Sequence, residues 1–131
     1  MVFILENLAI GSFQDAQSAQ EEVFAFLNVA EEIDLVLPQK VLYYKIPIRD
    51  FSLIPFEKLK EAIDWIHKYI DKYRILVFCN SGIGCSPSVV IGYLCVVLGF
   101  SFGQAVEFVA GKKPNISILP GLVQTIDEIL K

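Results

Sequence analysis

The chain has 131 residues, of which 54% are hydrophobic and 20% charged, and its formal net charge is −4. This length and apolar fraction suit one core, so we expect a single domain spanning residues 1–131. The excess of acidic residues argues against nucleic acid as a partner.

Other features of the sequence exclude further classes of protein. There is no basic start followed by an apolar core and a small-residue cleavage site, and the longest near-continuous apolar run, residues 89–100, is too short to cross a bilayer. We therefore expect no membrane association. Three cysteines, an odd number, fit a reducing compartment, so we expect a cytoplasmic protein with the nucleus as an alternative location. Because His67 is the only histidine and no carboxylates cluster around it, we expect neither a metal site nor a cofactor.

The first half of the chain alternates short apolar runs with polar segments. The opening run ends in Gly11-Ser12, which is a turn signal, and Pro47 places the end of a later apolar run near a sheet edge or a break. In chain order we predict a strand or strand pair at residues 2–10, a helix at 18–26, a short strand at 26–29, an irregular connection at 31–40 and a strand at 41–48.

The second half contains longer helical patterns. Residues 55–70 carry an apolar side chain every three or four positions, with Pro55 as the first residue of an amphipathic helix. Further along we predict a strand at 75–78, a loop, a buried helix at 86–98 closed by Gly99, a helix at 101–109 that Ser101 caps and Gly111 stops, and a final helix at 121–130. Strands alternating with helices predict a mainly parallel sheet with helices on both faces.

The pattern of residues 75–98 predicts an anion-binding site at the junction of a strand, a loop and a helix. Gly82 and Gly84 allow backbone N–H groups to turn inward, and the helix that begins near Ser86 adds unpaired N–H groups and the positive end of its dipole. Such surroundings favour a thiolate, so the pKa of Cys79 should be lowered. Cys79 is therefore a candidate nucleophile.

Residues 77–86, Val-Phe-Cys-Asn-Ser-Gly-Ile-Gly-Cys-Ser, resemble the signature of the protein tyrosine phosphatases and in particular of the small dual-specificity phosphatases. That signature is His-Cys, five residues, Arg, then Ser or Thr. The chain matches the cysteine, the glycine three residues later and the final hydroxyl of Ser86. It departs at two positions, because Cys85 replaces the arginine and Phe78 replaces the histidine.

The resemblance spans nearly the whole chain, since residues 4–12 followed by Asp15-Ala16 are similar to the opening of these domains, where a strand ending in Gly-Ser leads to a short helix. It implies an α/β, single-domain phosphotyrosine-phosphatase-like fold with a mainly parallel central sheet flanked by helices. It also implies Cys79 as nucleophile, Asp50 as general acid and Ser86 as the hydroxyl that stabilises the departing thiolate. The implied phosphate-binding residues are Asn80, Ser81, Gly82, Ile83, Gly84 and Cys85.

The expected function depends on Cys85. A thiol, unlike an arginine guanidinium, carries no permanent positive charge and cannot form two parallel hydrogen bonds to a phosphate. Losing one transition-state donor costs about 10²–10³ in rate, and an arginine supplies two charged hydrogen bonds. A cation from elsewhere, Lys112, Lys113 or Arg49, is the less favoured way to replace it. A second departure is Ile118-Leu119, where the family has Pro-Asn, and it puts the support of the loop in question.

Three hypotheses follow from these residues. The favoured one is a pseudophosphatase that binds a phosphorylated or unphosphorylated protein instead of hydrolysing it efficiently. The second is a weakly active, cysteine-dependent tyrosine or serine/threonine phosphatase. The third is a redox-responsive domain in which Cys79 and Cys85 form a reversible disulfide. The sequence carries no signal for an oligomeric state or for one phosphoamino acid.

Overall fold

A five-stranded sheet forms the centre of the computed structural model, which describes residues 1–19 and 21–131. The strand order is β1-β2-β5-β3-β4; β1 pairs antiparallel with β2, and the other three pairings are parallel. The predicted strand pair at the N-terminus and the mainly parallel sheet are therefore confirmed. The strands are β1 (Val2–Leu5), β2 (Leu8–Ser12), β3 (Ala25–Asn28), β4 (Leu42–Lys45) and β5 (Ile75–Cys79).

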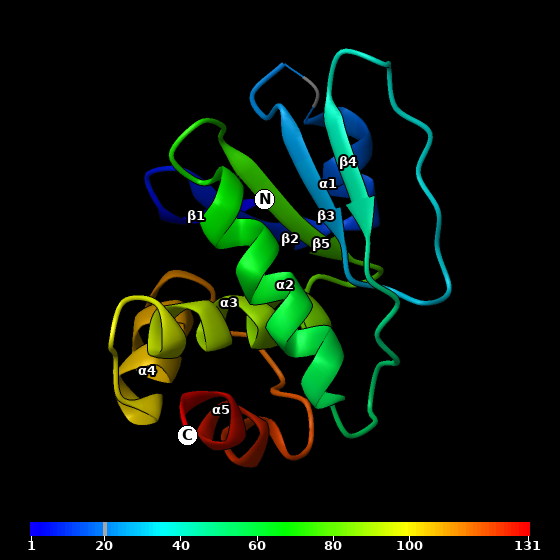
Figure 1. Cartoon of the computed structure of the whole chain (residues 1–131). Helices are drawn as coiled ribbons and strands as arrows, with labels where there is room; N and C mark the ends of the chain where they lie inside the picture. Colours follow the sequence, from blue (N-terminus) through cyan, green and yellow to red (C-terminus); the bar gives the residue numbers. More distant parts are fainter. Residues whose placement is uncertain (20) are drawn as a thin grey trace.

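The described residues form five helices, which are α1 (Phe13–Ser18), α2 (Phe56–Tyr69), α3 (Cys85–Val96), α4 (Phe102–Lys112) and α5 (Leu122–Leu130). α1 lies on one side of the sheet and α2 to α5 lie on the other, where α5 packs on α2 and α3 rather than on the strands (Figure 1). Alternate residues of β5 enter different cores: Val77 packs in the large cluster with α2 to α5, and Phe78 packs in the small cluster with Ala16 of α1. Among the described residues, no helix is long and apolar enough to span a membrane.

One predicted helix was wrong. The helix expected at residues 18–26 lies earlier, at Phe13–Ser18, and residue 20 of that range is outside the described residues. A capping box sets the actual start, because Ser12 Oγ accepts the Asp15 N–H at 3.1 Å and the Asp15 carboxylate accepts the Ser12 N–H at 3.0 Å. The short helix after Gly-Ser that the family resemblance implied is the one present.

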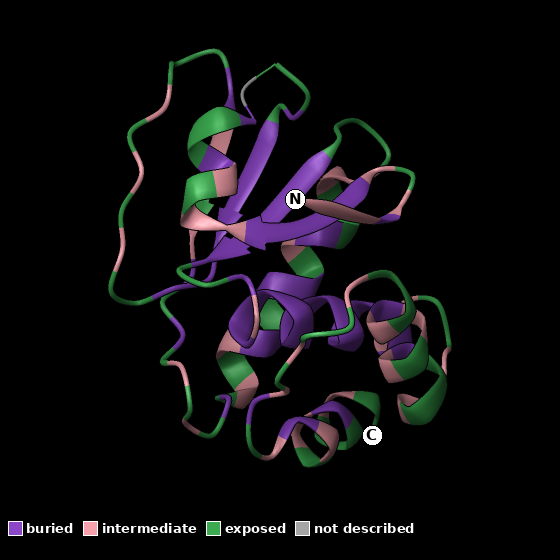
Figure 2. Ribbon diagram, turned by 180° about the vertical axis from the view of Figure 1, so that it is seen from behind, coloured by how far each residue is buried: buried purple, intermediate pink, exposed green. Residues whose placement is uncertain are grey.

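α3 is the central helix of the larger core, and its residues 85–95 are all buried (Figure 2). This explains why the sequence shows no polar face there. The absence of a side chain at Gly92 allows α2 to pack closely against α3. A Cβ at this position would lie 3.1 Å from side-chain carbons of Leu59 and Ile63. α3 begins at Cys85, one residue before the predicted start. α4 is capped by Ser101 as predicted but continues to Lys112, past the expected stop at Gly111.

Candidate functional site

The site lies at the carboxyl ends of the three central strands. Ser12 of β2 is in register with Cys79 of β5, and Asn28 of β3 is in register with Phe78. The segments that leave these strands therefore meet at one edge of the sheet, which is where open parallel sheets hold ligands. Residues 79–86, here called the signature loop, connect β5 to α3.

The conformation of the signature loop depends on Gly82. Its φ is +74°, and a Cβ there would lie 2.9–3.0 Å from backbone atoms of Gly11 and Ser12. A side chain would therefore meet both backbone strain and a steric clash. The Phe13 N–H donates to the Asn80 carbonyl at 3.2 Å, which ties the loop to the start of α1.

Hydrogen bonds from α3 and from the segment before α5 hold the other side of the loop. Ser88 Oγ donates to the Gly84 carbonyl at 2.8 Å and accepts the Leu119 N–H at 3.0 Å. The Ser117 N–H donates to the Ile83 carbonyl at 2.8 Å. Because these bonds use the backbone of residues 117–119, the change to Ile118-Leu119 leaves the loop supported.

Cys79 is buried, with 3% of its surface exposed, and its Sγ lies 3.4 Å from Ser86 Oγ. The pKa of Cys79 is lowered to about 6, as expected, but chiefly by a hydrogen bond from the Cys85 thiol. Burial acts against this, whereas the Ser86 hydroxyl and the N–H groups of Ser86 and Gly82 add to it. The thiolate is therefore the main form of Cys79 near neutral pH. The Cys85 side chain lowers the pKa of Cys79 more than the backbone N–H groups of Ser86 and Gly82 do.

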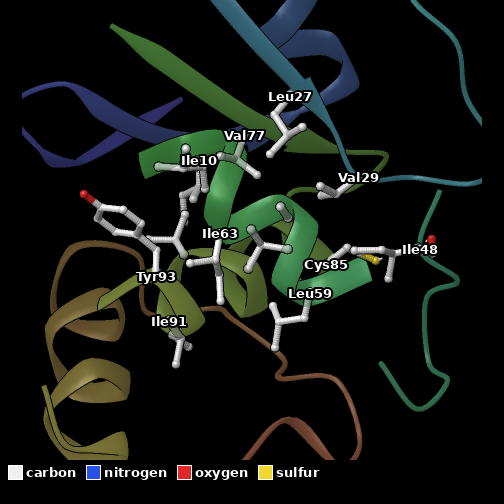
Figure 3. Packing of buried hydrophobic residues seen from close by; sticks show 14 of the residues in the cluster. Ile10, Leu27, Val29, Ile48, Leu59, Ile63, Val77, Cys85, Ile91 and Tyr93 are labelled. Carbon is white, nitrogen blue, oxygen red and sulfur yellow. Dashed lines mark hydrogen bonds between the residues drawn. The ribbon is translucent and has the colours of Figure 1, made fainter. Parts of the chain in front are cut away.

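Cys85 is the residue that the sequence resemblance assigns to the position of the family's arginine. It is 1% exposed, and its Sγ lies 4.0 Å from the Ile48 carbonyl, beside the Ile48 side chain in the core (Figure 3). The pKa of Cys85 is raised by its hydrogen bond to Cys79, by burial and by the negative charges of Cys79, Asp50 and Glu32. A buried, neutral thiol offers no charge to an anion.

Above the loop is a cavity of about 500 Å³. The loop forms one part of its wall, residues 49–51 after β4 form another, and an acidic turn after β3 forms a third. The lining residues are Asn80, Ser81, Ile83, Gly84, Arg49, Asp50, Phe51, Glu31, Glu32 and Ser117.

Asp50 lies against the loop, as its predicted role requires. A Cβ on Gly84 would lie 2.7 Å from Asp50 Oδ1, so this glycine makes room for the carboxylate. The Phe51 N–H donates to Asp50 Oδ1 at 3.0 Å. Phe51 itself has a φ of +60°, which is strained for a residue with a side chain, and its ring is 83% exposed at the cavity.

The three cations considered as replacements for the arginine are engaged elsewhere. Arg49 lines the cavity, but its Nε and Nη2 donate to the Glu31 carboxylate at 2.9 and 3.1 Å. That pairing raises the pKa of Arg49 and lowers the pKa of Glu31. Lys112 Nζ lies 5.4 Å from the ring centre of Phe108, and Lys113 Nζ bonds Asn115 Oδ1 at 3.3 Å.

The sequence analysis missed Glu31, Glu32 and Ser117. A signal for the acidic pair was present, because Glu31-Glu32 follows directly after a predicted strand whose carboxyl end faces the site. We had assigned this turn only as an irregular connection. Within the described part of the chain, no group of three or more His, Cys, Asp or Glu side chains is arranged to hold a metal ion.

The fold and the loop together define a phosphatase-type α/β domain with a cysteine at the end of its central strand. The family model "Dual specificity phosphatase, catalytic domain" matches residues 8–129. The chain therefore belongs to the dual-specificity phosphatase family.

Similar proteins support the same assignment. Mouse dual specificity protein phosphatase 15 is 28% identical over 134 residues, covering 98% of this chain and 57% of that protein. Human dual specificity protein phosphatase 5 is 29% identical over 139 residues, covering 98% and 36%. The chain thus spans about half the length of the curated relatives it matches, or less.

Solved structures confirm the predicted fold. The crystal structure of DUSP15 superposes with a TM-score of 0.85 at 27% identity, covering 98% of this chain and 86% of that one. Human tyrosine phosphatase-like serine/threonine/tyrosine-interacting protein gives a TM-score of 0.85 at 21% identity, covering 98% and 94%. The second match speaks for the fold alone.

Proposed function

We propose that the chain is a catalytically impaired phosphatase-like domain that binds a protein in the cavity above its signature loop. The main support for the proposal is the buried, uncharged Cys85 thiol at the position that the family resemblance assigns to the arginine. Cys79, Asp50 and Ser86 stand at the family positions of nucleophile, acid and hydroxyl. The guanidinium of Arg49, which lines the cavity, is however paired with Glu31.

The physical argument concerns the charge on a transferring phosphoryl group. Catalysis of this transfer depends on preorganised donors that face the equatorial oxygens. A thiol is a weak donor, and the Cys85 thiol is buried, with its Sγ 4.0 Å from the Ile48 carbonyl. Removing one donor costs about 10²–10³ in rate, so hydrolysis should fall at least that far.

Binding is the activity that the remaining parts of the site support. The loop backbone is held from β2, α1, α3 and residues 117–119, and the cavity above it is large enough to receive a side chain. The proposed partner is a protein, not nucleic acid or a membrane, and the proposed location is the cytoplasm or nucleus. Residues 1–131 are proposed to act as one domain.

The test is steady-state hydrolysis of p-nitrophenyl phosphate by the native chain, with Cys79→Ser as the matched control. We expect the two proteins to give the same rate, close to the uncatalysed background. Turnover that depends on Cys79 and lies within about tenfold of an active dual-specificity phosphatase would overturn the proposal in favour of a weak enzyme.

A redox role is the second candidate, because Cys79 and Cys85 are both free thiols and the neighbouring Cys85 thiol contributes most to the lowered pKa of Cys79. Hydrogen peroxide would oxidise the Cys79 thiolate to a sulfenic acid with release of hydroxide. The Cys85 thiol would then attack the Cys79 sulfur, forming a disulfide and releasing water.

Mass mapping after mild peroxide treatment and thiol blocking tests this role. A Cys79–Cys85 linkage that reductant reverses would support it, with the buried Cys95 remaining unlinked as an internal control. Conversion of Cys79 to sulfinic acid while Cys85 stays free would exclude it.

A further inference from the structure

The charges on the cavity wall are unusual for a phosphate pocket. Three carboxylates, Glu31, Glu32 and Asp50, face one guanidinium, that of Arg49. Arg49 is paired with Glu31, and in the part of the chain that the structure describes neither Glu32 nor Asp50 takes part in a salt bridge. Two carboxylates therefore remain without a cationic partner in the cavity.

The negative charges of these two carboxylates influence Cys85, which stands at the position of the family's positively charged arginine. Asp50 lies against the backbone of Gly84, the residue just before Cys85. The charges of both Asp50 and Glu32 contribute to the raised pKa of the Cys85 thiol. A phosphate dianion entering the cavity would meet a negative field at the point where an arginine would attract it.

The acidic turn is held firmly in this position. The buried Asn28 side chain donates to the Ile33 carbonyl at 2.8 Å and accepts the Ala30 N–H at 2.9 Å. The Glu31 N–H donates to the Ile48 carbonyl at 3.1 Å, which joins the turn to the segment after β4. Because its backbone is fixed on both sides, the turn keeps its carboxylates at the cavity.

Exposed apolar side chains lie in and beside the cavity. Phe51 lines it and is 83% exposed, and Leu53, which is 73% exposed, lines an adjacent hollow that Glu31 and Arg49 also line. An aromatic ring beside unpaired carboxylates suits a guanidinium, which hydrogen-bonds to carboxylates and stacks on aromatic faces. The exposed leucine suits an apolar neighbour of that cation.

We infer that the cavity binds an unphosphorylated protein segment through an arginine side chain that enters between Glu32 and Asp50 and stacks on Phe51. An apolar residue beside that arginine packs on Leu53. The loop and cavity define the site, and the unpaired carboxylates determine which ligand enters it. The inference rests on the proposed binding function and names its partner as a basic, apolar-flanked peptide instead of a phosphopeptide.

Fluorescence anisotropy with the full chain tests this inference. The probe is a labelled peptide, Ala-Leu-Arg-Tyr-Leu-Ala, compared with one version that carries neutral citrulline for the arginine and another that carries phosphotyrosine. We expect the arginine peptide to bind roughly tenfold more tightly than the citrulline peptide in about 50 mM salt, with a smaller ratio in about 500 mM salt. The phosphotyrosine peptide should bind more weakly than its parent.

Variants of the chain locate the effect. Glu32→Gln and Asp50→Asn should each reduce the preference for arginine over citrulline about threefold or more. Glu107→Gln, which removes an exposed carboxylate on α4, should leave the preference unchanged.

Three results would overturn the inference: equal binding of the arginine and citrulline peptides, tighter binding of the phosphotyrosine peptide, or no binding of the arginine peptide at about 1 mM. If one of these occurs while hydrolysis stays at background, the choice of ligand fails and the proposed function stands. Hydrolysis that depends on Cys79 and lies within about tenfold of an active dual-specificity phosphatase would instead remove the proposed function.

Discussion

The backbone of the signature loop and the side chains around the cavity differ in how well they suit a phosphate. The backbone has the glycine turn at Gly82, the N–H groups aimed at Cys79 and the hydrogen bonds of Ser88. The side chains offer a buried thiol at residue 85 and unpaired carboxylates at the wall. The loop backbone and the charge around it are therefore determined by separate residues, so one can change while the other is kept.

The largest expected effect comes from restoring the missing charge. Cys85→Arg should raise p-nitrophenyl phosphate hydrolysis about 10²–10³-fold, because Cys79, the proposed nucleophile, and the loop backbone would be unchanged. Cys85→Lys is the matched control and should give a smaller increase, since an ammonium supplies charge without the bidentate fork.

Adding Asp50→Asn to the restored protein should lower the rate again by about 10²-fold or more, as expected for the loss of a general acid. Circular dichroism establishes that each variant is folded. A folded Cys85→Arg protein with no activity above background would show that the side chains are not the only obstacle.

The loop backbone should be the more fragile region in unfolding. Gly82→Ala introduces a left-handed strain of about 1–2 kcal/mol and a clash with Gly11 and Ser12 worth about 1–3 kcal/mol more. Gly99 is a matched control, because its φ is +77° and a Cβ there has no neighbour within 4 Å. Urea unfolding should show Gly82→Ala to be more destabilising than Gly99→Ala, and equal values would contradict the role assigned to close backbone packing.

A smaller loss is expected when the support from α3 is removed. Ser88→Ala leaves the Leu119 N–H without its buried acceptor, which should lower the free energy of unfolding by about 1–3 kcal/mol. Ser18→Ala, which removes an exposed hydroxyl at the end of α1, should change it by less than about 0.5 kcal/mol. Similar values for the two variants would mean that the loop does not depend on Ser88.

The smallest effect concerns the Cys79 thiol. Because the thiolate is the reactive form and its pKa is about 6, the rate of alkylation should rise with pH through about 6 and then level off. Cys85→Ala removes the largest stabilising hydrogen bond, so the rise should move to higher pH, and Ser86→Ala should move it less. An unchanged midpoint in Cys85→Ala would remove Cys85 from this role.

The fold was largely predictable because the sequence combines strong local patterns with a family resemblance. The period of residues 55–70 and the apolar run after Pro87 predict α2 and α3 to within a residue or two. The helix predicted at residues 18–26 is wrong because the Ser12–Asp15 capping box starts α1 at Phe13, and residues 25–28 form β3 instead. Sequence spacing alone does not reveal which of two competing local signals begins a helix.

The residues of the site that are contiguous in the sequence were easier to predict than those that tertiary structure brings together from distant segments. Cys79 was proposed from the loop itself, and the family resemblance added Ser86 and Asp50. Glu32 reaches the cavity only through the pairing of β3 with β5 and the turn that Asn28 holds. The burial of Cys85 beside Ile48 likewise depends on tertiary packing, because Ile48 is 37 residues away in the sequence.

Calorimetric titration with orthovanadate compares anion binding by the native chain and by Cys85→Arg. Vanadate imitates the charge and shape of the phosphoryl group during transfer, so its affinity measures how well the pocket binds that group without the need for turnover. We expect no saturable binding to the native chain up to about 1 mM and saturable binding to Cys85→Arg. Equally tight binding to both proteins would show that the native pocket holds the anion without the arginine, and that Cys85 is not the cause of an impaired site.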